Sequence, residues 1–160
     1  MKGTKEVISI LNDVLTAELT AINQYFVHSE MCENWGYERL QHAIRAHSIG
    51  EMKHAEQVIE RILFLEGIPN VQKLGKINIG ESVEEQLKVD LALEMDALPR
   101  LRKGIESCHE SGDHNTRHLL EEILEEEEEH VDWIEAQLDQ IKQVGIANYL
   151  AQQIRNGEDS

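Results

Sequence analysis

Apolar residues recur at spacings of three and four along most of the chain, which is the pattern of amphipathic α-helices. Glycines and prolines interrupt this pattern at a few points. The pattern predicts four long helices and one short helix, over about residues 5–34, 38–65, 83–111, 115–144 and 146–155. Ser82 and Glu85 predict a capping box that opens the third helix. Pro99 is expected to kink that helix, because proline has no N–H group to donate.

The segment between the second and third helices, EGIPNVQKLGKINIG (66–80), contains helix breakers and is expected to be a long connection. Two helical hairpins joined by such a connection predict an all-α fold, namely a four-helix bundle with one long crossover and a short fifth C-terminal helix. The 160 residues are expected to form a single domain over residues 1–160. The last residues, NGEDS (156–160), are expected to fray.

The formal net charge of −16 disfavours nucleic-acid binding, which depends on Lys and Arg side chains that neutralise phosphates, and it suits cations. Cys32 and Cys108 form no disulfide framework and suit a reducing compartment. No segment approaches the ~18 consecutive apolar residues of a membrane span, and the N-terminus lacks the apolar core of a signal peptide. We therefore expect a cytoplasmic protein with no nucleic-acid or membrane partner.

Each of the four long helices carries one glutamate within its apolar stripe. These in-phase residues are Glu18, Glu51, Glu94 and Glu127. In the run of five glutamates at 125–129, only Glu127 is in phase with the apolar residues, so the other four are expected in solvent. A histidine follows two of these glutamates by three residues, in the pairs Glu51–His54 and Glu127–His130. Residues at this spacing lie on one helix face, with Cβ atoms about 5–6 Å apart, so each pair can bind one ion.

The spacing of these residues is duplicated. Glu18 and Glu51 are 33 residues apart, and the two glutamates of the second hairpin have the same separation. Gly36 lies 18 residues after Glu18 and 15 residues before Glu51, and the second hairpin repeats both distances around Gly112. In an antiparallel hairpin, a mismatch of three residues corresponds to only about 4.5 Å along the helix axis. The six side chains are therefore expected to converge at one level of the bundle.

Four buried carboxylates are costly unless they are neutralised, and no Lys or Arg is in phase to pair with them. Two divalent cations would balance the charge, with two bridging glutamates and one terminal glutamate and histidine for each ion. Oxygen and imidazole donors suit iron, manganese or zinc. A single in-phase Glu or His is more often a hydrogen-bonded core residue, but six with duplicated spacing favour a metal site. A glutamate on each of two helices and a Glu-x-x-His pair on each of the other two resembles the ligand pattern of ferritin-like di-iron proteins.

The sequence also resembles bacterioferritin over residues 1 to about 155. The segments that carry the resemblance are AINQYF (21–26), EMKHAE (51–56), IERILFLEGIPN (59–70), DLALE (90–94), EEEHVDW (127–133) and NYLAQQI (148–154). The resemblance implies a ferroxidase that oxidises Fe(II) with O2 or H2O2. It further implies a homo-oligomeric cage of 24 subunits, built from two-fold dimers, that stores the ferric mineral and receives electrons for iron release from a ferredoxin-type reductant.

The resemblance assigns roles to individual residues of a centre with two irons per subunit. It implies terminal ligands at Glu18, Glu94, His54 and His130, and bridging ligands at Glu51 and Glu127. Tyr25 is either an electron donor beside the centre or a core tyrosine that needs a hydrogen-bond partner. Met52 matches the axial ligand of a haem b shared between two subunits, although methionine at an interface is also a common packing residue. Weaker candidates for the haem pocket or dimer surface are Leu19, Phe26 and Trp35.

The stretch RAHSIGEM (45–52) departs from the family pattern. His47 stands where the family has a carboxylate, Gly50 replaces an aspartate, and Ala46 removes a possible iron ligand. His47 is either an additional ligand or a hydrogen-bonded core histidine. His114 and His118 are either a surface metal pair or simply exposed.

Two other functions use the same donors. One is a dinuclear manganese or iron peroxidase or catalase without storage, which would form a small oligomer. The other is a non-catalytic metal buffer or structural bundle, which would bind Zn(II) and consume no O2 when Fe(II) is added.

Overall fold

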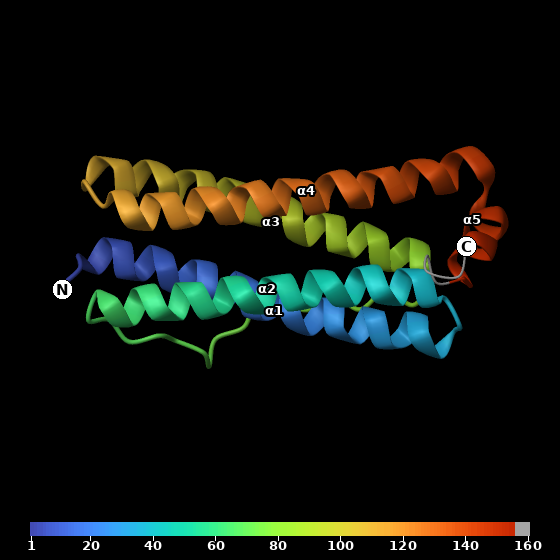
Figure 1. Cartoon of the computed structure of the whole chain (residues 1–160), viewed down its shortest axis with the longest axis horizontal. Helices are drawn as coiled ribbons and strands as arrows, with labels where there is room; N and C mark the ends of the chain where they lie inside the picture. Colours follow the sequence, from blue (N-terminus) through green and yellow to red (C-terminus); the bar gives the residue numbers. More distant parts are fainter. Residues whose placement is uncertain (156–160) are drawn as a thin grey trace.

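Helices account for all regular secondary structure in residues 1–155, the part of the chain that the computed structural model describes. They are α1 (Lys5–Asn34), α2 (Glu38–Phe64), α3 (Val83–Glu110), α4 (His114–Val144) and α5 (Ile146–Gln153). The prediction of an all-α, four-helix bundle with one crossover and a short fifth helix is confirmed (Figure 1). The segment expected to fray, 156–160, lies outside the described residues.

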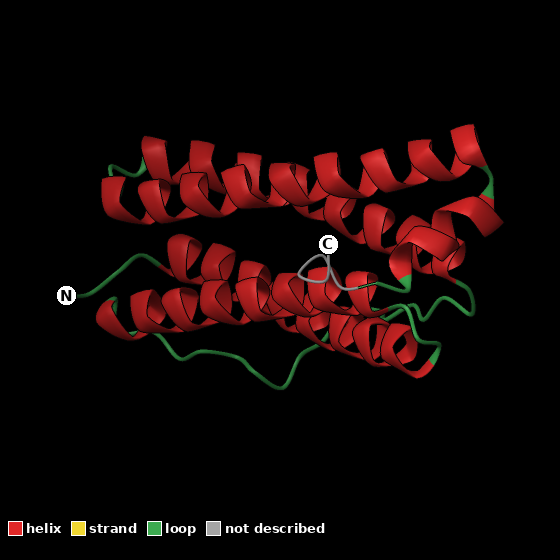
Figure 2. Ribbon diagram, turned by 45° about the vertical axis from the view of Figure 1, so that its right-hand side comes forward, coloured by secondary structure: helices red, strands yellow, loops and turns green. Residues whose placement is uncertain are grey.

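The bundle consists of two antiparallel hairpins, α1 with α2 and α3 with α4 (Figure 1). Their turns lie at opposite ends of the bundle, because the segment between α2 and α3 returns the chain along the whole length of the first hairpin (Figures 1 and 2). Helix α5 packs across the end at which α4 finishes (Figure 1). Among the described residues, no helix combines the length and apolar character that a membrane span requires.

Both hairpin turns use the same backbone motif. Gly36 and Gly112 follow α1 and α3 with φ angles of 85° and 74°, the left-handed conformation that glycine adopts without steric cost. The next residue in each turn donates its N–H to a carbonyl five residues earlier, from Tyr37 to Cys32 and from Asp113 to Cys108, both at 2.9 Å. These contacts define a Schellman motif at both helix ends. The two free cysteines are thus buried at equivalent positions of a duplicated helix cap.

The apolar core is divided into two clusters along the bundle axis. One cluster contains Leu11 and Leu15 of α1 with Ile62 and Leu120, and the other contains Tyr25 of α1 with buried residues nearer the opposite end. In each long helix, the in-phase glutamate predicted from the sequence falls between the residues of the two clusters. A polar layer therefore crosses the middle of the core.

Hydrogen bonds attach the crossover to α1. Three α1 side chains at four-residue spacing accept N–H groups of the crossover: Gly75 donates to Thr20 Oγ1 at 2.8 Å, Asn78 to Gln24 Oε1 at 3.1 Å, and Gly80 to His28 Nε2 at 3.0 Å. Residues four apart lie on one helix face, so a single stripe of α1 binds the extended segment. This stripe compensates the backbone groups of a segment that has no secondary structure of its own.

The same stripe binds a buried carboxylate of α3. Asp90 Oδ1 lies 2.9 Å from His28 Nδ1 and accepts a hydrogen bond from Gln24 Nε2 at 2.8 Å. Since the Nε2 of His28 accepts from Gly80, its Nδ1 carries the proton that it donates to Asp90. Burial raises the pKa of Asp90, and the bonds from His28 and Gln24 oppose that rise. The network joins α1, the crossover and α3.

Two local expectations concern α3. The side chain of Ser82 accepts the N–H of Glu85 at 3.3 Å, which confirms Ser82 as the cap of this helix. Helix α3 continues through Pro99 to Glu110 as one element, and the kink expected there stays a prediction.

We expect His28→Ala to destabilise the protein by about 3 kcal/mol, because it leaves the Asp90 carboxylate and the Gly80 N–H buried without their shared partner. Urea denaturation of the metal-free protein measures this loss. Asn23→Ala is the control, since Asn23 is exposed and its amide donates to the Leu19 carbonyl of its own helix. Equal stabilities of the two variants would contradict the structural role of the network.

Candidate metal centre

The six side chains predicted from helical phase meet in the polar layer at the middle of the bundle. Glu18 comes from α1, Glu94 from α3, and each of α2 and α4 contributes a glutamate and a histidine. All four glutamates and His54 are buried, and the His130 side chain is 13% exposed. The antiparallel hairpins bring these residues together because each lies near the middle of a helix of at least 27 residues.

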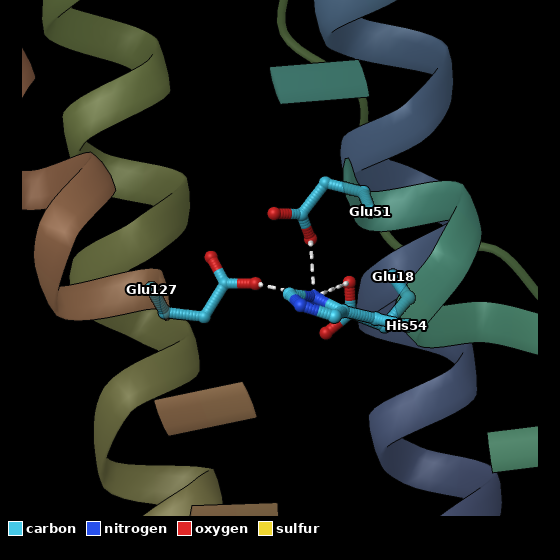
Figure 3. A group of neighbouring side chains, drawn as sticks. All are labelled: Glu18, Glu51, His54 and Glu127. Carbon is cyan, nitrogen blue, oxygen red and sulfur yellow. Dashed lines mark ion pairs between the residues drawn. The ribbon is translucent and has the colours of Figure 1, made fainter. Parts of the chain in front are cut away.

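The first donor group surrounds the ring of His54. Its Nδ1 lies 3.5 Å from Glu18 Oε2, 4.0 Å from Glu51 Oε2 and 3.3 Å from Glu127 Oε1 (Figure 3). One donor atom from each of these four residues lies within 4.8 Å of the others. Figure 3 shows the three carboxylates pointing toward the imidazole from different helices.

The second donor group surrounds the ring of His130. Its Nδ1 lies 3.1 Å from Glu51 Oε1, 3.7 Å from Glu94 Oε1 and 3.5 Å from Glu127 Oε2. Glu51 and Glu127 belong to both groups, and each turns one oxygen toward each histidine. Two carboxylates shared in this way can bridge two adjacent ions, while Glu18 and Glu94 each face one ion position only.

Six donor atoms of the centre have no hydrogen-bond partner among the described residues. The buried side-chain atoms without a hydrogen bond in the described residues are Glu18 Oε2, Glu51 Oε1, His54 Nδ1, both carboxylate oxygens of Glu127 and His130 Nδ1. Every one of these atoms belongs to the centre. An unsatisfied buried polar group costs about 1–3 kcal/mol, and more when it is charged. Six such atoms at one place fit a pair of metal ions, which would satisfy all of them.

Electrostatics lead to the same conclusion. Burial is the main cause that raises the pKa of Glu18 and Glu51 well above the usual range, and it raises the pKa of Glu94 to about 8. Burial opposes protonation of the two histidines, but Glu127 and the other carboxylates raise the pKa of His54 to about 9 and of His130 to about 12. The centre therefore holds protons when no metal is bound, and metal binding would release them.

Tyr25 contacts the centre directly. It is buried, and its hydroxyl donates a hydrogen bond to Glu94. Burial, followed by the Glu94 charge, raises the pKa of Tyr25 well above its usual value. The bond to Glu94 supplies the partner that a core tyrosine needs, and it also places the phenol next to a candidate ligand, so its role in electron transfer stays a prediction.

The other four glutamates of the run 125–129 are exposed, as expected, but Glu126 also contacts a histidine of the centre. Glu126 Oε2 lies 2.6 Å from the Nε2 of His54, although its side chain is 55% exposed. The sequence carried no signal for this contact, because Glu126 is out of phase with the apolar stripe of α4 and its partner belongs to α2.

His47 lies beside the centre without joining either donor group. Its ring centroid is 4.3 Å from that of His130, and it makes an edge contact with the ring of Trp133 at 4.9 Å. Burial, with a further contribution from His130, lowers the pKa of His47 to about 4. His47 thus packs as a neutral ring against a candidate ligand. A Cβ atom built at Gly50 would meet no other described atom within 4 Å beyond the adjacent residues and its own helix backbone, so this position has room for a Cβ atom.

Two cavities reach the centre from opposite sides. One, of about 420 Å³, lies beside α1, α3 and the crossover and is lined by the four glutamates, with Lys73 and Lys76 from the crossover. The other, of about 480 Å³, lies between α2 and α4 and is lined by the two histidines, with the nearby glutamates Glu122, Glu125, Glu126 and Glu129. The carboxylate face and the histidine face of the centre are therefore approached separately.

The haem candidate lies on a different surface. Met52 is 53% exposed on α2, at helical spacing from the exposed Ile49 and Leu63. Phe26 is exposed as well, Trp35 packs against Tyr37 near the hairpin turn, and Leu19 packs against the core. An exposed thioether within an apolar strip fits a ligand shared with a second subunit. His114 and His118 are exposed and belong to neither donor group.

Comparison with known proteins identifies relatives over nearly the whole chain. Residues 8–144 match the Ferritin-like domain family model. The chain is 48% identical to Bacterioferritin of Mycobacterium bovis over 152 residues, which cover 95% of this chain and 96% of the relative. It is 45% identical to Bacterioferritin of Streptomyces coelicolor over 94% of this chain and 90% of the relative. It is 43% identical to Bacterioferritin of Brucella melitensis over 93% of this chain and 92% of the relative.

We predict that the metal-free protein loses stability as the pH rises from about 5 to about 8. The folded-state pKa of Glu94 is raised from 4.5 to about 8, so the folded form binds this proton more tightly than the unfolded chain does. That contribution is complete below the unfolded pKa and is lost as the pH rises through the folded pKa. Thermal denaturation after chelation should therefore show a shallower pH dependence for Glu94→Gln than for the wild type.

Glu129→Gln serves as the control for this comparison, because Glu129 is exposed and lies outside both donor groups. Saturating Zn(II) should reverse the sign of the pH dependence in the wild type, since the metal displaces the same protons. Parallel curves for Glu94→Gln and the wild type would rule out Glu94 as the source of the effect.

Proposed function

The chain belongs to the bacterioferritin family of ferritin-like proteins, and on this premise we propose that it oxidises Fe(II) at the six-residue centre and stores the ferric product. The store would be a cage of 24 copies built from two-fold dimers. The proposed oxidant is O2 or H2O2, and a ferredoxin-type reductant would supply electrons when iron is released. We place this activity in the cytoplasm.

The observation that carries the proposal is the sharing of two buried carboxylates between two histidines. Glu51 and Glu127 each direct one oxygen to each donor group, so two ferrous ions would occupy adjacent positions. Each ion position has the two shared glutamates, one glutamate of its own and one histidine. Four protein ligands leave coordination positions open for an oxidant. Two Fe(II) ions supply two electrons, which with two protons convert O2 to H2O2 or H2O2 to two water molecules.

The chain contributes charge and position to this reaction. Each iron ion gains one positive charge on oxidation, and four enclosed carboxylates stabilise the more highly charged product more strongly. Low solvent access strengthens that difference, because the glutamates lie in a layer between two apolar clusters. We propose Tyr25 as an electron donor beside the centre, a role that its hydrogen bond to Glu94 supports.

The apolar strip around Met52 supports a second proposed element, a haem b bound between two subunits. The thioether sulfur would supply one axial ligand, and the same residue of a second copy would supply the other. The strip includes Ile49 and Leu63, whose exposed apolar side chains would help to hold the haem. When bound, the haem supplies a path for electrons to stored iron.

Family membership favours storage over the two rival functions. A dinuclear peroxidase and a non-catalytic metal buffer would use the same six donors, but neither requires an exposed apolar strip on α2.

We predict that Glu127→Ala abolishes rapid oxidation of Fe(II), because Glu127 is shared by both ion positions. Aerobic addition of Fe(II), followed by ferric absorbance and by particle size, measures oxidation and storage together. Glu128→Ala is the matched control, since the neighbouring Glu128 is exposed and pairs with Arg102. Both variants should assemble as the wild type does.

Oxidation at an unchanged rate in Glu127→Ala would reject the dinuclear centre as the site of reaction. A wild-type particle of monomer size, 18.3 kDa, would reject the storage cage even if oxidation were rapid.

We also predict that Met52→Leu removes the haem absorbance of the purified protein while Fe(II) oxidation continues at the wild-type rate. Leucine keeps the apolar volume but has no sulfur ligand. Met95→Leu is the control, because Met95 of α3 is similarly exposed, at 50% against 53% for Met52. Retention of the haem band in Met52→Leu would show that Met52 is not its ligand.

A further inference from the structure

The histidines of the two donor groups are held differently. The Nε2 of His54 contacts Glu126 Oε2 at 2.6 Å, while its Nδ1 faces Glu18, Glu51 and Glu127. A carboxylate on one ring nitrogen fixes the proton there, orients the ring and leaves the other nitrogen free to bind a metal ion.

His130 has no such carboxylate in the described part of the chain. Its Nδ1 faces the centre, but no side chain there makes a hydrogen bond to its Nε2. Its ring instead packs against the ring of His47 at 4.3 Å. Its side chain is also more open, at 13% exposed compared with 3% for His54.

A departure from the internal sequence repeat accounts for this difference between the two histidines. Residues of the first hairpin have counterparts 76 residues later in the second: Glu18 and Glu94, Glu51 and Glu127, His54 and His130, and the turn glycines Gly36 and Gly112. By the same separation, the counterpart of Glu126 is Gly50. Glu126 reaches from α4 to the histidine of α2, so a carboxylate at position 50 of α2 would be directed to the histidine of α4.

Glycine at this position is not required by the fold. Gly50 lies within α2 without a positive φ angle, and a Cβ atom built there would meet nothing within 4 Å. Crowding at the Cβ position therefore does not account for the missing carboxylate.

We propose that Glu126 is a positioning residue for His54, and that the lack of its counterpart at Gly50 makes the two metal positions unequal. The position formed by Glu18, Glu51, His54 and Glu127 binds its ion more tightly and fills first. The inference rests on the dinuclear centre of the proposed function and goes beyond it, because that function requires two ions but no order of filling.

The test uses Co(II) alone, added without oxygen to the full-length protein. Wild-type protein should bind two ions per subunit in two separate steps. The visible absorption of bound Co(II) monitors both steps. In crystals grown with one equivalent of Co(II) per subunit, anomalous scattering should place the ion beside His54. Equal occupancy of the two positions would overturn the inference.

Two substitutions act in opposite directions. Glu126→Gln should weaken the first step by about 10- to 100-fold, the usual effect of losing a carboxylate behind a ligand histidine. Gly50→Glu should strengthen the second step by a similar factor. The controls are Glu129→Gln, which changes an exposed glutamate lining the same cavity, and Gly50→Ala, which removes the glycine without adding a carboxylate. Neither control should alter the order of filling.

The outcomes separate this inference from the proposed function. A Glu126→Gln variant that fills in the wild-type order with wild-type affinities would overturn the role of Glu126 while leaving the centre intact. A wild-type protein that binds no pair of ions would instead remove the dinuclear centre, and with it the basis of both proposals.

Discussion

Four carboxylates enclosed in one layer, with no lysine or arginine bridged to them in the described structure, are the constraint on which the rest of this protein depends. The layer separates the apolar core into two clusters, so each long helix must give up a core position in its middle. Without ions, protons compensate, as the raised pKa values of Glu18, Glu51 and Glu94 indicate. Two metal ions would compensate better, because they satisfy all six orphaned atoms at once.

The duplicated hairpin is the structural means of assembling this layer. Each hairpin ends in the same Schellman motif, with a left-handed glycine and a buried cysteine at matching positions. Because the two turns share this geometry, the equal residue spacing from Gly36 and from Gly112 gives the glutamates and histidines matching heights within their hairpins. The repeat is not perfect, however, since Glu126 and Gly50 occupy matching positions. At this position the two halves of the centre differ, because one has a carboxylate and the other has none.

The crossover has a role beyond joining the hairpins. Its N–H groups bind a stripe of α1, and that stripe also binds Asp90, one turn before Glu94 on α3. Tyr25 directly follows Gln24 in the sequence, and its hydroxyl donates a hydrogen bond to Glu94. Displacing the crossover would therefore disturb the position of a candidate ligand, so an extended surface segment is linked by buried hydrogen bonds to the chemistry of the core.

Helical periodicity and residue spacing alone were enough to predict the fold class and the six side chains that meet. The buried face of a helix is apolar at regular intervals, so a polar residue in that phase can be recognised in the sequence. Spacing from Gly36 and Gly112 was enough to predict their height within each hairpin. Only the tertiary structure decided that the turns lie at opposite ends, which oxygen of Glu51 faces which histidine, and that Glu126 contacts His54. The position of the turns depends on how the crossover packs against the bundle, and the contacts depend on how polar side chains from several helices are oriented, so periodicity along one helix carries no information about either.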